Sequence, residues 1–301
     1  MPILSGITIQ GGALGICVPI SVPIVFQGSN FGYTSGGLPG CNVIDKFPFA
    51  SDANASNVGT LTQARREVAG QSSSVSGYTS GGWAPPQVNT IDKFPFASDA
   101  NATDVGDLTQ ARYAPAGQSS TASGYTSGGT PPLVNTIDKF PFASDANATD
   151  VGDLTQARFG LAGQSSTVSG YTSGGPGSSV IDKFPFASDG NATNVGSLTQ
   201  GRRCVAGQSS SVSGYTSGGP GSNVIDKFPF ASDGNATDVG DLTQGRYGSA
   251  GQSSTVSGYT SGGNVPPNVN TIDKFPFASN ANATDVGDLT VVRQLAAGQQ
   301  Y

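Results

Sequence analysis

The sequence predicts an all-β fold in which six four-stranded antiparallel blades form a β-propeller, preceded by a short extended arm. Three observations predict this fold. The chain contains six near-identical units with spacings of 44 to 47 residues. Each unit holds four short stretches that alternate polar and apolar residues, and Gly or Pro interrupts every stretch within about ten residues.

The repeat is marked by the phrase Gly-Tyr-Thr-Ser-Gly-Gly, which recurs at spacings of 45, 47, 46, 44 and 44 residues. Each copy continues with Ile-Asp-Lys-Phe-Pro-Phe, a turn rich in Asn, Asp, Ala and Thr, and a Leu-Thr step before an aligned arginine. An Ala-Gly-Gln step follows each arginine. The phrase begins at Gly32, Gly77, Gly124, Gly170, Gly214 and Gly258, and the arginines are Arg65, Arg112, Arg158, Arg202, Arg246 and Arg293. A period of this length indicates a repeat architecture.

Four strands are expected in each repeat, and we name them A, B, C and D in chain order. They correspond to Ser-Ser-Thr-Val-Ser, Gly-Tyr-Thr-Ser, Val-Asn-Thr-Ile-Asp-Lys-Phe and Thr-Asp-Val-Gly-Asp-Leu. No segment has the 3.6-residue period of an amphipathic helix, so we expect almost no helix. A parallel β-helix is the competing architecture, but four strands every ~45 residues is the period of propeller blades.

Glycine, phenylalanine and proline have distinct roles in this interpretation. The double glycine, such as Gly36-Gly37, permits positive φ at the end of strand B. Phe47, Phe49 and their counterparts are expected to fill the space between blades. The proline between them cannot donate to a β-ladder, so it should mark a strand end or an edge.

The repeat resembles the kelch repeat. Gly36-Gly37 after a Tyr-containing strand, the Ile-Asp-Lys-Phe segment and Leu-Thr-x-x-Arg are similar to the double glycine, the aromatic strand and the pre-arginine segment of that family. The resemblance covers residues 31–301 and implies that this range is one six-bladed propeller. The sequence departs from the family in the fourth strand, where Val or Leu stands in place of the usual Trp.

One strand A must come from a terminus, because complete A strands occur only between repeats. Gln294 to Gln299 keeps the spacing of the other copies after Arg293. We therefore expect the C-terminus to complete the first blade, while the residues from Phe26 to Phe31 could finish or replace that strand.

Residues 1–30 form a separate arm in this interpretation, and no charged residue appears before Asp45. The alternation from residue 18 to residue 26 predicts a strand with one apolar face, and its prolines restrict it to an edge. The residues expected to anchor the arm are Ile7, Ile9, Val18, Ile20, Val22, Ile24 and Phe26. Packing against its own propeller and docking onto another subunit both remain open.

Differences among the copies gather in the B-to-C loops and the D-to-A segments. These are residues 38–41, 83–87, 130–133, 176–179, 220–223 and 264–267, and residues 66–68, 113–115, 159–161, 203–205, 247–249 and 294–296. Both connections emerge at one end of an antiparallel blade, and we call that surface the variable face. The residues expected to bind a partner there are Arg66, Glu67, Trp83, Gln87, Tyr113, Phe159, Arg203 and Tyr247. Drift in unconstrained loops is the alternative explanation.

The C-to-D turn carries enough oxygen ligands to suggest Ca²⁺, but it lacks the ligand order of an EF-hand loop. A structural turn, in which Asp and Asn bond their own backbone, is the favoured interpretation, and we expect no metal. The turn also repeats an N-glycosylation sequon, to which we give little weight without a secretory signal. The rings of Arg and Lys suggest either a charged central channel or, as we favour, pairing with Asp within each blade.

Composition excludes several classes of function. The net charge is −6 without a basic stripe, so no nucleic-acid partner is expected. His is absent and Glu67 is the one glutamate, which leaves no support for catalysis, and we expect no enzyme activity and no cofactor. The three cysteines imply no disulfide framework. We expect neither a signal peptide nor membrane insertion.

These observations predict a structural or recognition module. The first hypothesis is a bacteriophage virion protein, such as a tail fibre, tip, spike or decoration protein, assembled in the host cytoplasm. It would bind other virion or scaffold proteins through its arm and a host surface protein or glycan through the propeller. The opening Ile3 to Gly12 resembles the starts of marine, cyanophage-type structural proteins. The alternatives are a glycan-binding lectin or adhesin of cellular origin and an intracellular kelch adaptor.

Overall fold

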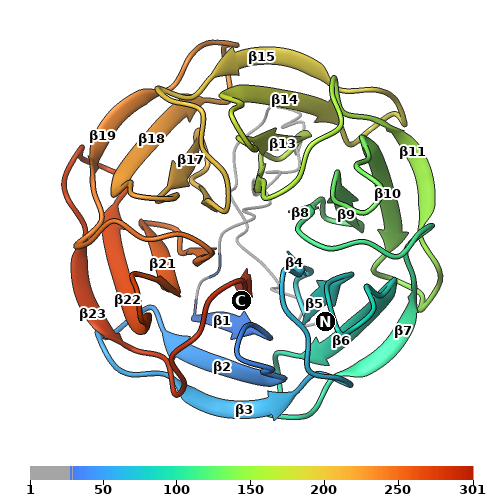
Figure 1. Ribbon diagram of the computed structural model, residues 1–301, viewed down its shortest axis with the longest axis horizontal. Helices are drawn as coiled ribbons and strands as arrows, with labels where there is room; N and C mark the ends of the chain where they lie inside the picture. The colour runs from blue at the N-terminus through green and yellow to red at the C-terminus, as the bar shows by residue number, and fades with distance from the viewer. Residues whose placement is uncertain (1–27, 29, 301) are drawn as a thin grey trace, which may run out of the picture.

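The computed structural model describes residue 28 and residues 30–300 of the chain. These residues form twenty-four β-strands in six four-stranded sheets around a central axis (Figure 1). Neighbouring strands within every sheet are antiparallel, and the described residues contain no helix. The predicted all-β, six-bladed propeller is therefore confirmed.

Each blade places strand A next to the axis and strand D at the outer rim. The A strands are β24 (Ala297–Gln300), β4 (Ala69–Ser72), β8 (Ala116–Ser119), β12 (Ala162–Ser165), β16 (Ala206–Ser209) and β20 (Ala250–Ser253). The B strands are β1 (Phe31–Ser35), β5 (Ser76–Ser80), β9 (Ser123–Ser127), β13 (Ser169–Ser173), β17 (Ser213–Ser217) and β21 (Ser257–Asn264). The C strands are β2 (Val43–Pro48), β6 (Thr90–Pro95), β10 (Thr136–Pro141), β14 (Val180–Pro185), β18 (Val224–Pro229) and β22 (Asn268–Pro276). The D strands are β3 (Ser56–Thr60), β7 (Thr103–Asp107), β11 (Thr149–Asp153), β15 (Thr193–Ser197), β19 (Thr237–Asp241) and β23 (Thr284–Asp288).

Strand A lies earlier in the repeat than the sequence predicts. It consists of Ala-Gly-Gln-Ser, or Ala-Gly-Gln-Gln in β24, and the Ser-Thr-Val segment that follows is a turn. In blade 4 the hydroxyl of Ser166 accepts the backbone N–H groups of Val168 and Ser169 at 3.3 and 3.0 Å. A serine that bonds its own turn in this way competes with strand formation, and alternation alone does not distinguish the two.

The C-terminal strand closes the ring. β24 pairs with β1, with Ala297 opposite Ser35 and Gln300 opposite Gly32. The prediction that the C-terminus completes the first blade is therefore confirmed. Gly28 lies instead against the sixth blade, where its N–H donates to the carbonyl of Ser253 at 2.8 Å.

The double glycine and the proline behave as the sequence predicts. Gly36 and Gly37 have φ of 70° and 119°, and the N–H of Gly37 donates to the carbonyl of Arg65 at 2.8 Å. Each C strand ends at the proline of Phe-Pro-Phe, as β2 does at Pro48. In five blades strand B ends just before the double glycine, whereas β21 (Ser257–Asn264) continues through Gly262 and Gly263.

The apolar core lies between blades, as expected for Phe47 and Phe49. The Phe47 ring covers Gly32 of its own blade and contacts Tyr259 of blade 6, with ring centroids 5.6 Å apart. Phe49 stacks on Tyr259 at 4.7 Å, and Ile272 completes this cluster. Six such clusters repeat around the ring among the described residues. Because each fully buried aromatic contributes about 1.5–3 kcal/mol, the clusters hold neighbouring blades together.

Candidate functional site

The two sets of variable loops lie at one end of the propeller, as predicted. At four junctions between blades, a β-bridge joins a D-to-A segment to the B-to-C loop of the blade that follows it. The bridged pairs are Arg66 with Trp83, Tyr113 with Thr130, Tyr247 with Asn264, and Gln294 with Leu38. Backbone bridges therefore link the two sets of variable loops at four of the six junctions among the described residues.

The structure brings five of the predicted binding residues together around the B-to-C loop of blade 2. The Trp83 and Tyr113 rings meet edge to face, with centroids 5.5 Å apart and an interplanar angle of 82°. Arg66 and Trp83 exchange backbone hydrogen bonds, and Gln87 forms a β-bridge with Trp83. Nε of Arg66 lies 3.7 Å from a carboxylate oxygen of Glu67. All five side chains are half-buried, so they are held in place yet reachable.

The other three predicted residues are spread around the variable face. Phe159 and Tyr247 are half-buried and Arg203 is exposed. The backbones of Tyr247 and Asn264 exchange hydrogen bonds at 3.3 and 2.8 Å. The structure therefore assembles one aromatic cluster and three separate positions.

Six residues of the D-to-A segments form a closed circle of backbone hydrogen bonds around the axis. Each N–H donates to the carbonyl of its counterpart in the preceding segment, as Ala114 donates to Glu67 at 2.7 Å and Cys204 to Gly160 at 2.7 Å. All six have left-handed backbone conformations, with φ from 52° to 67°. The members of this left-handed ring are Glu67, Ala114, Gly160, Cys204, Gly248 and Leu295. Four are not glycine, and because such residues rarely adopt this conformation, no local sequence pattern predicts the ring.

A shallow funnel of about 60 Å³ lies at the left-handed ring. Val68, Leu161 and Val205 are among the side chains that line it. Burial raises the pKa of the Glu67 carboxyl, and Arg66 opposes that rise. Burial also raises the pKa of the Cys204 thiol, which keeps it protonated and weakly nucleophilic.

Glutamines of the A strands cross the gaps between blades instead of pointing at the axis. Nε2 of Gln71 donates to Ser80 of its own blade at 2.8 Å. It also reaches the carbonyl of Tyr125 and the hydroxyl of Thr126 in the next blade, both at 3.0 Å. Gln71 is 1% exposed, so these contacts replace water. The glutamine of the Ala-Gly-Gln step shared by all copies therefore links neighbouring blades through side-chain hydrogen bonds.

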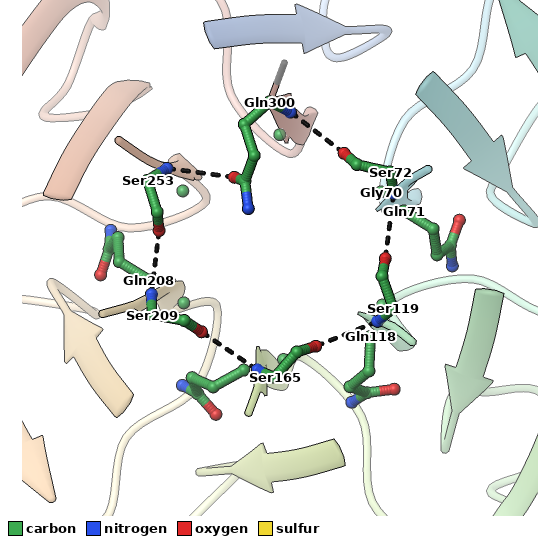
Figure 2. Close-up of a pocket in the computed structure, with 16 residues that line it drawn as sticks. Gly70, Gln71, Ser72, Gln118, Ser119, Ser165, Gln208, Ser209, Ser253 and Gln300 are labelled. Atoms are coloured by element: carbon green, nitrogen blue, oxygen red, sulfur yellow. Dashed lines mark hydrogen bonds between the residues drawn. The ribbon is translucent and has the colours of Figure 1, made fainter. Parts of the chain in front are cut away.

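A second circle of hydrogen bonds surrounds the central axis at the end opposite the left-handed ring. A cavity of about 60 Å³ lies there (Figure 2). Each A-strand N–H donates to the side-chain oxygen at the same position of the next blade, as Ser72 donates to Ser119 at 2.9 Å. The members of the circle are Ser72, Ser119, Ser165, Ser209, Ser253 and Gln300. Gln300, which lies on the closing strand β24, thus takes the place of a sixth serine in this circle.

The arginines do not form a charged channel, and they pair between blades instead of within them as the sequence analysis favoured. Nη2 of Arg65, which follows the first blade, lies 3.2 Å from Asp92 of the second. Both side chains are fully buried. Asp92 also accepts the N–H and hydroxyl of Thr62 at 2.9 and 2.7 Å. Burial lowers the pKa of Arg65, and the charge of Asp92 opposes that shift.

The arginines differ in the acceptors that Nη1 reaches, and Nη1 of Arg65, which faces the Pro85-Pro86 loop, donates to the carbonyl of Thr90 at 3.3 Å. Where the loop is short, Nη1 donates to one carbonyl at each end of the loop, as Arg158 does to Gly174 and Val180 at 2.6 and 2.9 Å. The Arg158–Asp182 distance is then 2.7 Å. Among the described residues, Nη1 of Arg112 and of Arg246, which face longer Pro-Pro loops, finds no acceptor.

The lysines form an outer set of ion pairs that also joins neighbouring blades. Nζ of Lys46 lies 3.0 Å from Asp99, which is in the C-to-D turn of the next blade. Five such pairs occur among the described residues. Lys227 faces the position where Asn280 replaces the aspartate. The prediction of pairing within each blade was therefore wrong for Lys as well as Arg.

The oxygen atoms of the C-to-D turns serve the turns and the blade contacts. Asn57 accepts the N–H of Gly59 within β3, directly after the turn, at 3.0 Å. Asn101, in the C-to-D turn of blade 2, accepts the N–H of Thr60 in the preceding blade at 3.0 Å. Among residues 28 and 30–300, no group of three or more Asp, Glu, Cys or His side chains lies in a metal-binding arrangement. The predicted arm residues, Ile7 to Phe26, lie outside the described residues. No described helix is long and apolar enough to span a bilayer.

Comparisons with known proteins support the fold. No known family matches the chain, and no curated protein matches it. A solved structure, the structure of YjhT, is similar with a TM-score of 0.64 and 12% sequence identity, covering 77% of this chain and 86% of YjhT. At this identity the likeness shows a shared propeller fold, which is compatible with a binding or recognition role, and it carries no activity to this chain.

Proposed function

We propose that the protein is a non-enzymatic recognition and structural protein, namely a bacteriophage virion component with a kelch-type repeat. In this proposal the arm of residues 1–30 attaches it to another virion protein, and the variable face contacts a host surface. The observation that carries the proposal is the variable face. Differences among otherwise near-identical blades gather at one end of a rigid ring, which is where recognition loops are usually found.

The chemistry of the cluster around the B-to-C loop of blade 2 supports a binding role. Trp, Tyr and Arg dominate the energy of protein interfaces, and Trp83, Tyr113 and Arg66 are half-buried neighbours here. The rings of Trp83 and Tyr113 already pack against each other, so little side-chain conformational entropy would be lost on binding.

The charged side chains also support a role without catalysis. The six buried Arg–Asp pairs satisfy each other between blades. The Cys204 thiol has a raised pKa, which disfavours the thiolate. Neither group is poised for chemistry in the described residues.

The proposal is tested at the particle and at the host cell. Mass spectrometry of purified phage particles from the source culture should detect peptides of this chain. Fluorescently labelled protein should adsorb to host cells, and the pair Trp83→Ala and Tyr113→Ala should reduce adsorption at least tenfold. Leu133→Ala, an exposed change elsewhere on the variable face, is the matched control. Absence from particles, or equal adsorption by all three proteins, would contradict the proposal.

A cellular lectin is the second candidate, and the Trp83–Tyr113 pair favours it specifically because half-exposed aromatic rings can stack on sugars. A glycan-array signal that is lost in the double variant and kept when residues 1–30 are removed would favour the lectin. A chain that assembles only with residues 1–30 present would favour the virion component.

A further inference from the structure

Exposed valines surround the axis on the face opposite the variable face. They occupy the same position in the A-to-B turns of blades 2, 4, 5 and 6. Their exposed fractions are 64% for Val75, 66% for Val168, 65% for Val212 and 66% for Val256. The backbone of each turn is fixed, since the carbonyl of Val75 accepts the N–H of Phe96 at 3.0 Å. The fold therefore uses the backbone of these residues and leaves four apolar side chains facing outward.

The arm joins the propeller on this same face. The N–H of Gly28 donates to the carbonyl of Ser253 at 2.8 Å, and Gly28 forms a parallel bridge with Ser254. Ser254 begins the turn that carries Val256, and its hydroxyl accepts the N–H of Val256 at 3.3 Å. The carbonyl of Asn30 accepts the N–H of Phe49 at 2.9 Å. Gly28, the residue that follows residues 1–27, is thus held beside the turn that carries Val256.

The sequence before Gly28 suits these valines. Residues 18, 20, 22, 24 and 26 are all apolar, and no residue from 1 to 27 is charged. Nine residues in an extended chain span about 30 Å, and residue 26 lies two positions from Gly28. The apolar side of this segment is therefore tethered within reach of the valines. A short tether gives an effective concentration on the order of millimolar, which favours the chain's own segment over that of a second copy.

We propose that residues 18–26 bind across the A-to-B turns of their own propeller, with their apolar side on the four valines. Residues 1–17 are then left to engage the partner, and only this last role rests on the proposed function. Bound in this way, the arm leaves the propeller in a fixed direction, so the variable face is held at a set orientation to the attachment point.

Hydrogen exchange on the full chain tests the proposal, at a concentration where light scattering shows a monomer. Backbone amides within residues 18–26 should exchange about tenfold more slowly in the parent protein than in a variant carrying Ser at the four valine positions. The matched control changes Leu133→Ser and Val292→Ser, two other exposed apolar residues, and should behave as the parent. Slow exchange of the amides of β4 (Ala69–Ser72) confirms that each variant is folded.

Three outcomes would overturn the proposal: equal exchange in parent and valine variant, no protection in the monomer, or protection that appears only when copies associate. If the fourfold variant does not fold, Val212→Ser with Val256→Ser is measured instead and must also reduce protection. Deleting residues 1–17 separates the two proposals. It should abolish attachment to the partner while leaving residues 18–26 protected.

Discussion

The glycines at the centre of the A strands should tolerate no side chain. A Cβ built on Gly163 would clash with the carbonyl oxygen of Gly117 and lie 2.8 Å from its carbonyl carbon. Counterpart glycines in the other A strands meet the preceding blade in the same way. Gly163→Ala must therefore push β12 away from β8, and neither strand can move alone because both belong to a closed ring.

The expected loss of stability follows from two contributions. Inserting a methyl group into a packed region costs about 1–3 kcal/mol. The same Cβ would lie 3.1 Å from Nε2 of Gln118, which bonds Ser127 in its own blade and Tyr171 and Thr172 in the next. Losing two of these bonds removes about 1 kcal/mol each. The sum is about 3–5 kcal/mol, or roughly 5–15 °C in Tm.

Gly190→Ala is the matched control, because no atom lies within 4 Å of its added Cβ. Four sibling repeats already carry Ala at this position in the C-to-D turn. This control should be neutral or stabilising by about 0.4–1 kcal/mol through the unfolded state. Urea denaturation followed by circular dichroism compares the two variants. If Gly163→Ala and Gly190→Ala differ by less than about 0.5 kcal/mol, close approach of the A strands does not limit this position.

Three further predictions concern charges. Asp182→Asn leaves the buried Arg158 guanidinium without its counter-charge and should lower the free energy of unfolding by about 3–5 kcal/mol in denaturant melts; a loss under about 1 kcal/mol would contradict the pairing. Asn280→Asp supplies the partner that Lys227 lacks and should add about 0.2–1 kcal/mol at low salt and nothing in 1 M NaCl, since exposed pairs are screened; a gain that persists in salt would have another cause. Burial raises the pKa of Glu67, so the folded protein disfavours its ionised form and loses stability as pH rises from below the ordinary value of 4.5 through the raised pKa. Glu67→Gln should remove that loss, and identical stability curves for both proteins between pH 4 and pH 7 would refute it.

Sequence reasoning identified the features that repeat with a strong local signal. The double glycine, the Phe-Pro-Phe step and the register after Arg293 predicted strand ends, the core between blades and the closing strand, and each was confirmed. Glycine, proline and periodicity act locally, so they can be read from the chain itself.

The features that were missed depend on contacts between blades. Nothing in the sequence around Arg65 shows whether its partner is in the same blade, and the structure places Asp92 in the next one. Alternation placed strand A in Ser-Ser-Thr-Val-Ser, whereas the strand is Ala-Gly-Gln-Ser, and close packing around the axis requires its glycine. The left-handed ring at Glu67, Ala114, Cys204 and Leu295 has no local signal, because these types seldom adopt positive φ.

Closure by β24 has a consequence for biosynthesis. Strand β1 emerges from the ribosome before the other described strands, and one of its edges stays unpaired until Ala297–Gln300 has been translated. An unpaired edge is open to pairing with other chains. Any product that stops before residue 297 keeps that edge, and a tag fused close behind Gln300 would sit beside the serine circle of the channel. Translation of residues 297–300 therefore decides whether the propeller is a closed ring or keeps an unpaired edge on β1.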